Sequence, residues 1–126
     1  MPQPVYLPDR AEPRSVTTTL TGTTPVTLVP APQIDEIYVV IEIGGRNESG
    51  ATRILNIVLD KGGTDYYVSR VAALAFLSWF HGTASSYVGI TPIILDATDE
   101  KLEVSLDAAG TYPIVAYYYV VQKTKF

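Results

Sequence analysis

The sequence predicts an all-β fold, an antiparallel β-sandwich of jelly-roll type with about eight strands. Short runs rich in β-branched and aromatic residues recur at intervals of roughly 8 to 15 residues. Turn-forming residues separate these runs, for example at Gly22–Pro25 and again at residues 60–65. A single segment, residues 71–80, has the apolar spacing of a helix. Many short strands with at most one short helix are typical of a two-layer β protein.

Residues 1–15 are predicted to form an extended N-terminal arm, followed by one sandwich domain over residues 16–126. Prolines at positions 2, 4, 8 and 13 prevent a helix and remove donors from any sheet ladder. Val5, Tyr6 and Leu7 give the arm a small apolar anchor, so we expect them to contact a neighbouring chain. A solvated tail is the alternative.

The first part of the domain alternates between predicted strands and turns. Val- and Thr-rich runs flank the first turn, and Ile37–Ile43 has the alternation of a core strand. A polar loop follows at residues 44–50, and Asp60–Asp65 has the composition of a hairpin turn. The strands predicted here cover residues 16–20, 26–29, 37–43, 53–59 and 66–71.

Two interpretations stay open for residues 71–80. Ala and Leu content, together with the spacing of Val71, Leu74 and Ser78, favours one short helix or helical turn. The strand-like flanks at residues 66–69 and 87–95 favour a continued β structure. Trp79 is a candidate interface residue in either case.

The closing strands are predicted at residues 87–95, 102–106 and 114–121. In the last of these, apolar side chains occupy both faces, which breaks the usual alternation of a strand with one face in water. A two-layer sandwich buries one face of each sheet, so the second face is predicted to meet another chain. The residues expected on that second face are Val115, Tyr117, Tyr119 and Val121.

Composition argues against several classes of function. The net charge is −4, and the nine Lys and Arg residues are scattered without a basic run, so we expect no direct nucleic-acid partner. There is no Cys, which removes disulfides, thiolate nucleophiles and thiolate metal sites. The longest apolar stretch, Val71–Phe80, is far shorter than the roughly 20 residues a bilayer requires, and no secretion signal precedes it. We therefore expect no membrane partner.

No catalytic constellation is predicted. His81 is the single histidine, and the nearby Ser78, Ser85 and Ser86 are not part of a Gly-x-Ser-x-Gly elbow. We therefore interpret the chain as a non-enzyme.

Two groups of residues could bind a ligand, one a cation and the other a sugar, but each has a simpler structural explanation. An acidic group near the C-terminus is a candidate cation site, but its spacing does not match an EF-hand, and Asp is common in turns. Tyr117, Tyr118 and Tyr119, with Trp79 and Phe80, could form a sugar-binding platform, but a continuous apolar strand favours a subunit interface. We therefore predict no metal and no cofactor. The acidic residues are Asp96, Asp99, Glu100, Glu103 and Asp107.

The order of these motifs resembles small structural proteins of tailed bacteriophages, in particular capsid decoration (cement) proteins and related jelly-roll virion proteins. The residues that carry the resemblance are 26–32, 37–43, 95–102 and the strand after 108–111. The resemblance implies a non-enzymatic homo-oligomer, with a trimer favoured, seated on the capsid surface of the virion and bound to the major capsid protein. A phage tail, connector or fibre-tip module and a carbohydrate-binding module are the alternatives.

Overall fold

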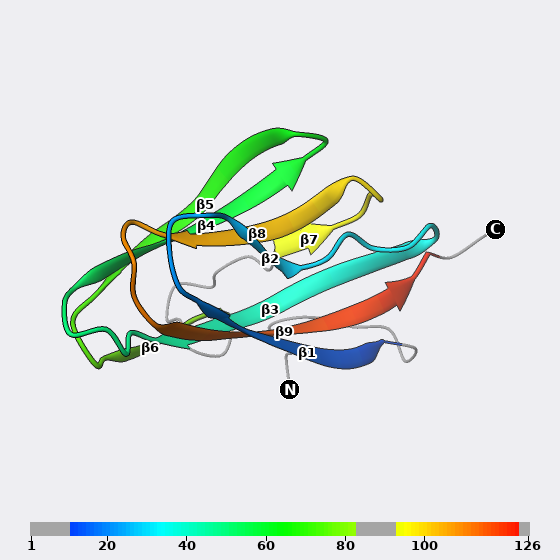
Figure 1. The fold of residues 1–126 in the computed structure, drawn as a ribbon. Coiled ribbons are helices and arrows are strands. Elements are labelled where there is room, and N and C mark those ends of the chain that lie inside the picture. Colours follow the sequence, from blue (N-terminus) through cyan, green and yellow to red (C-terminus); the bar gives the residue numbers. More distant parts are fainter. Residues whose placement is uncertain (1–10, 83–92, 124–126) are drawn as a thin grey trace.

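The computed structural model describes residues 11–82 and 93–123, which form two facing antiparallel sheets (Figure 1). No helix occurs within these residues, and so none that could span a membrane. The all-β sandwich predicted from the sequence is therefore confirmed. The strands are β1 (Glu12–Leu20), β2 (Val26–Val29), β3 (Glu36–Arg46), β4 (Arg53–Lys61), β5 (Thr64–Ala73), β6 (Ser78–Gly82), β7 (Ile93–Leu95), β8 (Glu100–Leu106) and β9 (Tyr112–Gln122).

Strands distant in sequence lie side by side in each sheet. The first sheet has the order β1-β9-β3-β6, and the second has the order β2-β8-β4-β5. Strand β7 pairs with residues 38–40 of β3, and β6 pairs with residues 42–46, both on the side of β3 away from β9. These two short strands thus share one strand position. Four positions in each sheet make the eight-position arrangement of a jelly roll.

The core lies between the two sheets and follows the alternation of the strands. In β8, every second residue is buried, as the sequence predicted for residues 102–106. Each fully buried Leu, Ile or Val contributes about 1.5–3 kcal/mol relative to an exposed one. The largest fully buried side chains include Tyr112, Leu20, Leu28, Ile43, Leu55, Ile57 and Leu102.

The sandwich begins earlier than the sequence suggested. Strand β1 starts at Glu12, which pairs with Val120 of β9, so residues 12–15 belong to the sheet. Pro13 is compatible with this position because β1 is an edge strand. One side of an edge strand faces solvent, so a backbone N–H missing on that side costs no hydrogen bond within the sheet. Residues 1–10, with the predicted anchor Val5, Tyr6 and Leu7, lie outside the described part of the chain.

The helical interpretation of residues 71–80 is wrong. Val71 and Ala73 belong to β5 and pair with Leu55 and Arg53 of β4, while Ser78 begins β6. Between the two strands lies a turn at residues 74–77, in which Phe76 has a φ of 62°. That positive φ is incompatible with a right-handed helix. Of the strand predicted at residues 87–95, only β7 falls within the described residues.

Candidate interaction surface

The two faces of β9 differ in burial as the sequence pattern predicted. Ile114, Ala116, Tyr118 and Val120 are buried in the core. On the other face, Tyr117 is 43% exposed, and the neighbouring positions are half-buried. The four β9 side chains of the predicted interface therefore point away from the core. The half-buried neighbours are Val115, Tyr119 and Val121.

Apolar side chains of the adjacent strands extend this surface. On β3, Val39 lies opposite Tyr119. On the far side of β3, Ile94 of β7 lies opposite Val39 and is 50% exposed. Glu42, opposite Tyr117, brings one charge into the surface, because a bulge after Val40 shifts the register. We call this surface the outward face; its apolar residues are Ile37, Val39, Ile94, Val115, Tyr117, Tyr119 and Val121.

The outer surface of the second sheet is different in character. The positions that alternate with the buried Leu55 and Ile57 of β4, and their cross-strand partners, are mostly polar or charged. The apolar exceptions are Ile54, Val58, Tyr67 and Ala72, and Tyr67 is 71% exposed. The outer surface of the first sheet is thus mainly apolar on β9, β3 and β7, with Ser15, Thr17 and Thr19 on edge strand β1, whereas the outer surface of the second sheet is mainly polar. The polar positions are Asn56, Asp60, Asp65, Arg70, Lys101, Glu103 and Ser105.

The outward face is hollowed at the end where β6 joins the first sheet. A groove of about 550 Å³ lies there, lined in part by the backbone of Gly44 and Gly45. Its lining includes Thr17, Thr19, Gly44, Gly45, Pro113 and Val115, together with Arg46 and Ser78 at one end. A second hollow of about 270 Å³ lies beside Ile41, Tyr117 and Tyr119. We call the larger hollow the groove.

The structure separates the tyrosines that could have formed a sugar-binding platform. Tyr118 faces the core, where its ring centroid lies 5.0 Å from that of Tyr38, with the ring planes tilted by 44°. Burial raises the pKa of Tyr38, and Glu36 adds to the effect. Tyr117 and Tyr119 remain on the outward face, so the three consecutive rings do not share one surface. The side chains of Trp79, Phe80 and His81 lie outside the described residues.

The acidic residues considered as a cation site have separate structural roles. Buried Glu100 forms an ion pair with Lys61, at 3.3 Å between Nζ and Oε2, and its Oε1 accepts a hydrogen bond from the backbone N–H of Asp96. Hydrogen bonding with Glu100 lowers the pKa of Asp96. Asp107 accepts a hydrogen bond from the backbone N–H of Ile54. Glu100 thus binds a backbone group of its own turn, as turn chemistry predicts, and Asp107 binds the backbone of β4.

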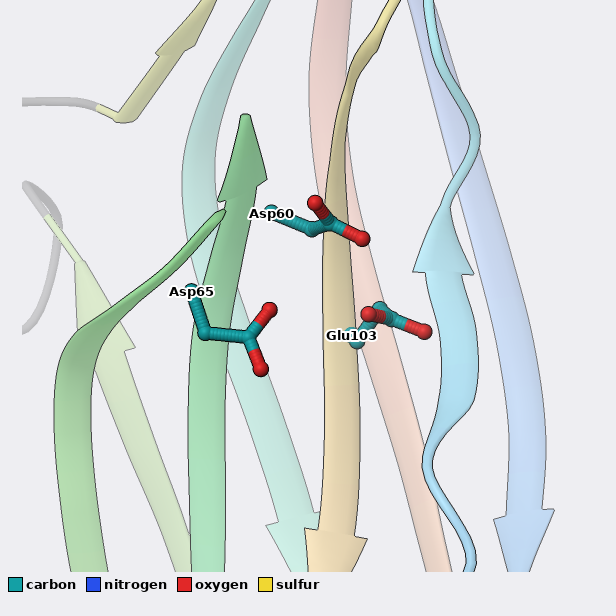
Figure 2. A group of neighbouring side chains, drawn as sticks. All are labelled: Asp60, Asp65 and Glu103. Carbon is teal, nitrogen blue, oxygen red and sulfur yellow. The ribbon is translucent and has the colours of Figure 1, made fainter. Parts of the chain in front are cut away.

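Glu103 belongs instead to a different acidic group on the second sheet, with Asp60 and Asp65 (Figure 2). The three carboxylates come from neighbouring strands, and their oxygens lie within 4.8 Å of one another. Partial burial raises the pKa of Glu103, Lys101 opposes that shift, and Asp60 and Asp65 reinforce it. A hard cation would find three oxygen donors here, about half of the 6–8 that Ca²⁺ takes.

Sequence reasoning missed this acidic group for a definite reason. Asp60 and Asp65 flank the predicted hairpin turn, which places them opposite each other across β4 and β5. The proximity of Asp60 and Asp65 could therefore have been predicted from the sequence. Glu103 joins them through the register of β4 with β8, where it lies opposite Val58. No local pattern encodes that register.

No family model and no curated protein sequence matches this chain. Among solved structures, it is similar to a protein of Bacillus endospore appendages, described as a novel family of disulfide-linked pili. The TM-score is 0.50, with 14% sequence identity over 90% of this chain and 89% of that one. What the two proteins share is the fold.

Two further solved structures are less similar. The structure of infectious bursal disease virus, Gx strain, matches with a TM-score of 0.49 and 12% identity over 94% of this chain. This chain covers 33% of that viral protein. The nucleoplasmin-like N-terminal domain of Drosophila FKBP39 matches with a TM-score of 0.47 and 8% identity, over 95% of this chain and 100% of that domain.

Proposed function

We propose that this chain is a non-enzymatic structural subunit of a virion, which assembles through its outward face. The observation that carries the proposal is the contrast between the two outer surfaces of the sandwich. One is mainly polar, with Tyr67 as its exposed aromatic residue, and the other presents Tyr117, Tyr119 and Ile94 among half-buried aliphatic residues. A large apolar surface with a polar counterpart on the same molecule marks the side that meets a partner.

The free energy gained by covering the outward face indicates how strong a contact through it can be. Covering about 400 Å² of apolar surface would contribute about 10 kcal/mol, at roughly 25 cal/mol per Å². Association costs about 4–15 kcal/mol in lost freedom of motion. One outward face therefore supports a contact of moderate strength. A lattice, in which each copy makes several contacts at once, suits such a surface better than an isolated dimer does.

Among virion proteins, we favour a capsid decoration protein that binds the major capsid protein on the capsid surface. We expect it to act as a homo-oligomer, with a trimer favoured. Such a protein acts by mass action, because it binds the assembled shell and so favours it over free subunits. The sequence motifs described above and the jelly-roll fold support this proposal. The similar pilus protein is described as disulfide-linked; this chain has no Cys, so its contacts would be non-covalent.

The experiment compares two tyrosine substitutions on opposite surfaces. Tyr117→Lys places a charge on the outward face, next to Glu42, which keeps the fold tolerant of it. Tyr67→Lys is the matched control, because Tyr67 is 71% exposed on the polar surface. Sedimentation velocity at micromolar concentration should show oligomers for the wild type and the control, and monomers for Tyr117→Lys. Equal association of both variants would overturn the proposed interface.

A further inference from the structure

The turn between β5 and β6 exposes three large apolar side chains. Leu74 is 61% exposed, Phe76 is 56% exposed and Leu77 is 50% exposed, within four consecutive residues. We call residues 74–77 the apolar turn. Single exposed apolar residues are ordinary on protein surfaces, but a cluster of this kind marks an interaction site.

Hydrogen bonds at both ends hold the apolar turn in one shape. The backbone N–H of Phe76 donates to the carbonyl oxygen of Asn47, at 2.6 Å between N and O. The backbone N–H of Asn47 donates to the carbonyl of Leu77 at 2.9 Å, and its side-chain Nδ2 donates to the carbonyl of Ala73 at 2.9 Å. Asn47 itself is fully buried. The apolar side chains are therefore presented by a rigid support, which lowers the entropy cost of binding.

Phe76 occupies a backbone conformation that favours glycine. Its φ is 62°, in the left-handed region, where a side chain costs roughly 1–2 kcal/mol. More than half of its surface is exposed, so packing in the core does not offset that cost. An observed backbone outlier of this kind is grounds for a functional hypothesis. The position keeps a large aromatic ring where glycine would give a more stable turn.

The groove lies next to the apolar turn on the same molecule. Ser78 directly follows the turn and lines the groove. The charged residue in the lining, Arg46, has its Nε 3.7 Å from Oε1 of Glu48, so its charge is balanced. Residues 71–80 carry no charge at all. An uncharged apolar projection and a charge-balanced hollow of about 550 Å³, the size of typical ligand sites at ~300–1,000 Å³, are complementary.

We propose that the apolar turn of one copy docks into the groove of a second copy. The inference rests on the proposed function, because the groove is the hollow end of the outward face. Leu74, Phe76 and Leu77 of the same copy are exposed and are not among the residues that line the groove. The two contacting surfaces differ, so every copy offers one of each. Such a heterologous contact builds a ring or an extending array of copies.

A lipid surface is the other occupant that an apolar turn could meet. Loops that insert into membranes combine apolar side chains with unpaired Lys and Arg, which attract anionic headgroups. Here the net charge of the chain is −4, and the nearby Arg46 is already paired with Glu48. A second copy therefore fits the surroundings of the apolar turn better than a membrane does.

The experiment uses three variants of the full chain, two that alter the turn and one that blocks the groove, with one control. Phe76→Gly deletes the projecting ring and relieves the positive φ, so its thermal midpoint should equal or exceed that of the wild type. Leu77→Ser is a second variant of the turn that leaves Phe76 in place. Thr17→Arg places a long charged side chain in the groove from the exposed edge strand β1. Thr27→Arg, on the exposed part of edge strand β2 in the other sheet, is the matched control.

Sedimentation velocity and native mass spectrometry then read out the association. Each turn variant and Thr17→Arg should be monomeric alone, whereas Thr27→Arg should associate like the wild type. An equimolar mixture of Phe76→Gly and Thr17→Arg should form a 1:1 dimer, because one intact turn then meets one intact groove. A mixture that stays monomeric would overturn the inference, as would unchanged association of the separate variants.

Two further readouts separate this inference from its alternatives. If Tyr117→Lys abolishes association but the mixture gives no dimer, the outward face remains the interface, and only the docking of the turn is wrong. If the mixture gives a dimer while Tyr117→Lys associates normally, the turn docks but the proposed face does not contribute. Binding of the wild type to phosphatidylcholine vesicles that is lost in Phe76→Gly would overturn the inference in favour of a membrane.

Discussion

Asn47 shows how much one buried polar residue organises at the end of the sandwich. Its Nδ2 donates to the carbonyl oxygens of Ala51 and Ala73, and its Oδ1 accepts a hydrogen bond from the backbone N–H of Ser49, all at 2.9 Å. With its backbone bonds to Phe76 and Leu77, one residue connects the loop after β3 to the apolar turn. A fully satisfied buried amide of this kind specifies a single loop arrangement.

Replacing Asn47 with Ala should lower the free energy of unfolding by about 3 kcal/mol, because several buried backbone groups would lose their partners. Asn56→Ala is the control, since Asn56 is half-buried on the polar surface of β4, and we expect a change within about 0.5 kcal/mol. Urea unfolding followed by circular dichroism measures both. A loss below about 1 kcal/mol for Asn47→Ala would show that the loops are held by other contacts.

At the scale of single elements, strands could be predicted where alternation or composition was clear. The alternation of β8 and the two apolar faces of β9 were visible in the sequence, and both agree with the burial observed. Residues 71–80 were ambiguous because a short apolar run fits helix and strand alike. The turn within this segment is held by hydrogen bonds from Asn47 to Phe76 and Leu77. These residues are about thirty positions apart, so the local sequence does not show the contacts.

The acidic group on β4, β5 and β8 makes stability depend on pH. Partial burial raises the pKa of Glu103 in the folded protein, with Asp60 and Asp65 adding to the shift, so folding favours the protonated form. The folded state therefore gains stability as pH falls through the raised pKa, until the unfolded chain also takes up its proton near 4.5.

Glu103→Gln should consequently raise the thermal midpoint at pH 7 and reduce the dependence of the midpoint on pH above 4.5. Differential scanning calorimetry at several pH values measures this, and Glu48→Gln, an exposed carboxylate outside the group, is the control. A lower midpoint for Glu103→Gln at pH 7 would mean that its weak pair with Lys101, at 4.0 Å, outweighs the repulsion.

For the whole molecule, the sandwich architecture could be predicted, whereas its interaction surfaces could be predicted only in part. The outward face of β9 could be predicted because the sequence of this strand has apolar residues on both faces. The groove was not, because Thr17, Gly44 and Val115 come together only through the order β1-β9-β3. Surfaces assembled from strands that are distant in sequence follow from topology and register, which composition does not reveal.

The arm is the remaining part of the molecule with a predicted role. Strand β1 begins at Glu12, so a deletion that ends at Arg10 removes most of the predicted arm and leaves β1 intact. An extended segment of that length reaches about 35 Å, enough to cross onto an adjacent subunit. From the sequence, we propose that its prolines favour an extended chain at low entropy cost and that Val5, Tyr6 and Leu7 would supply an apolar contact.

Deleting residues 2–10 should therefore leave the circular dichroism spectrum and thermal midpoint near those of the full chain, and weaken binding to assembled shells. Co-sedimentation with tailed-phage capsids that lack their decoration protein measures the binding. The control is the full-length chain with Val5, Tyr6 and Leu7 replaced by Ser, which keeps the length of the arm but removes its anchor. If both variants bind capsids like the wild type and protect them equally from heat, the arm is a solvated tail. Attachment would then depend on the outward face alone.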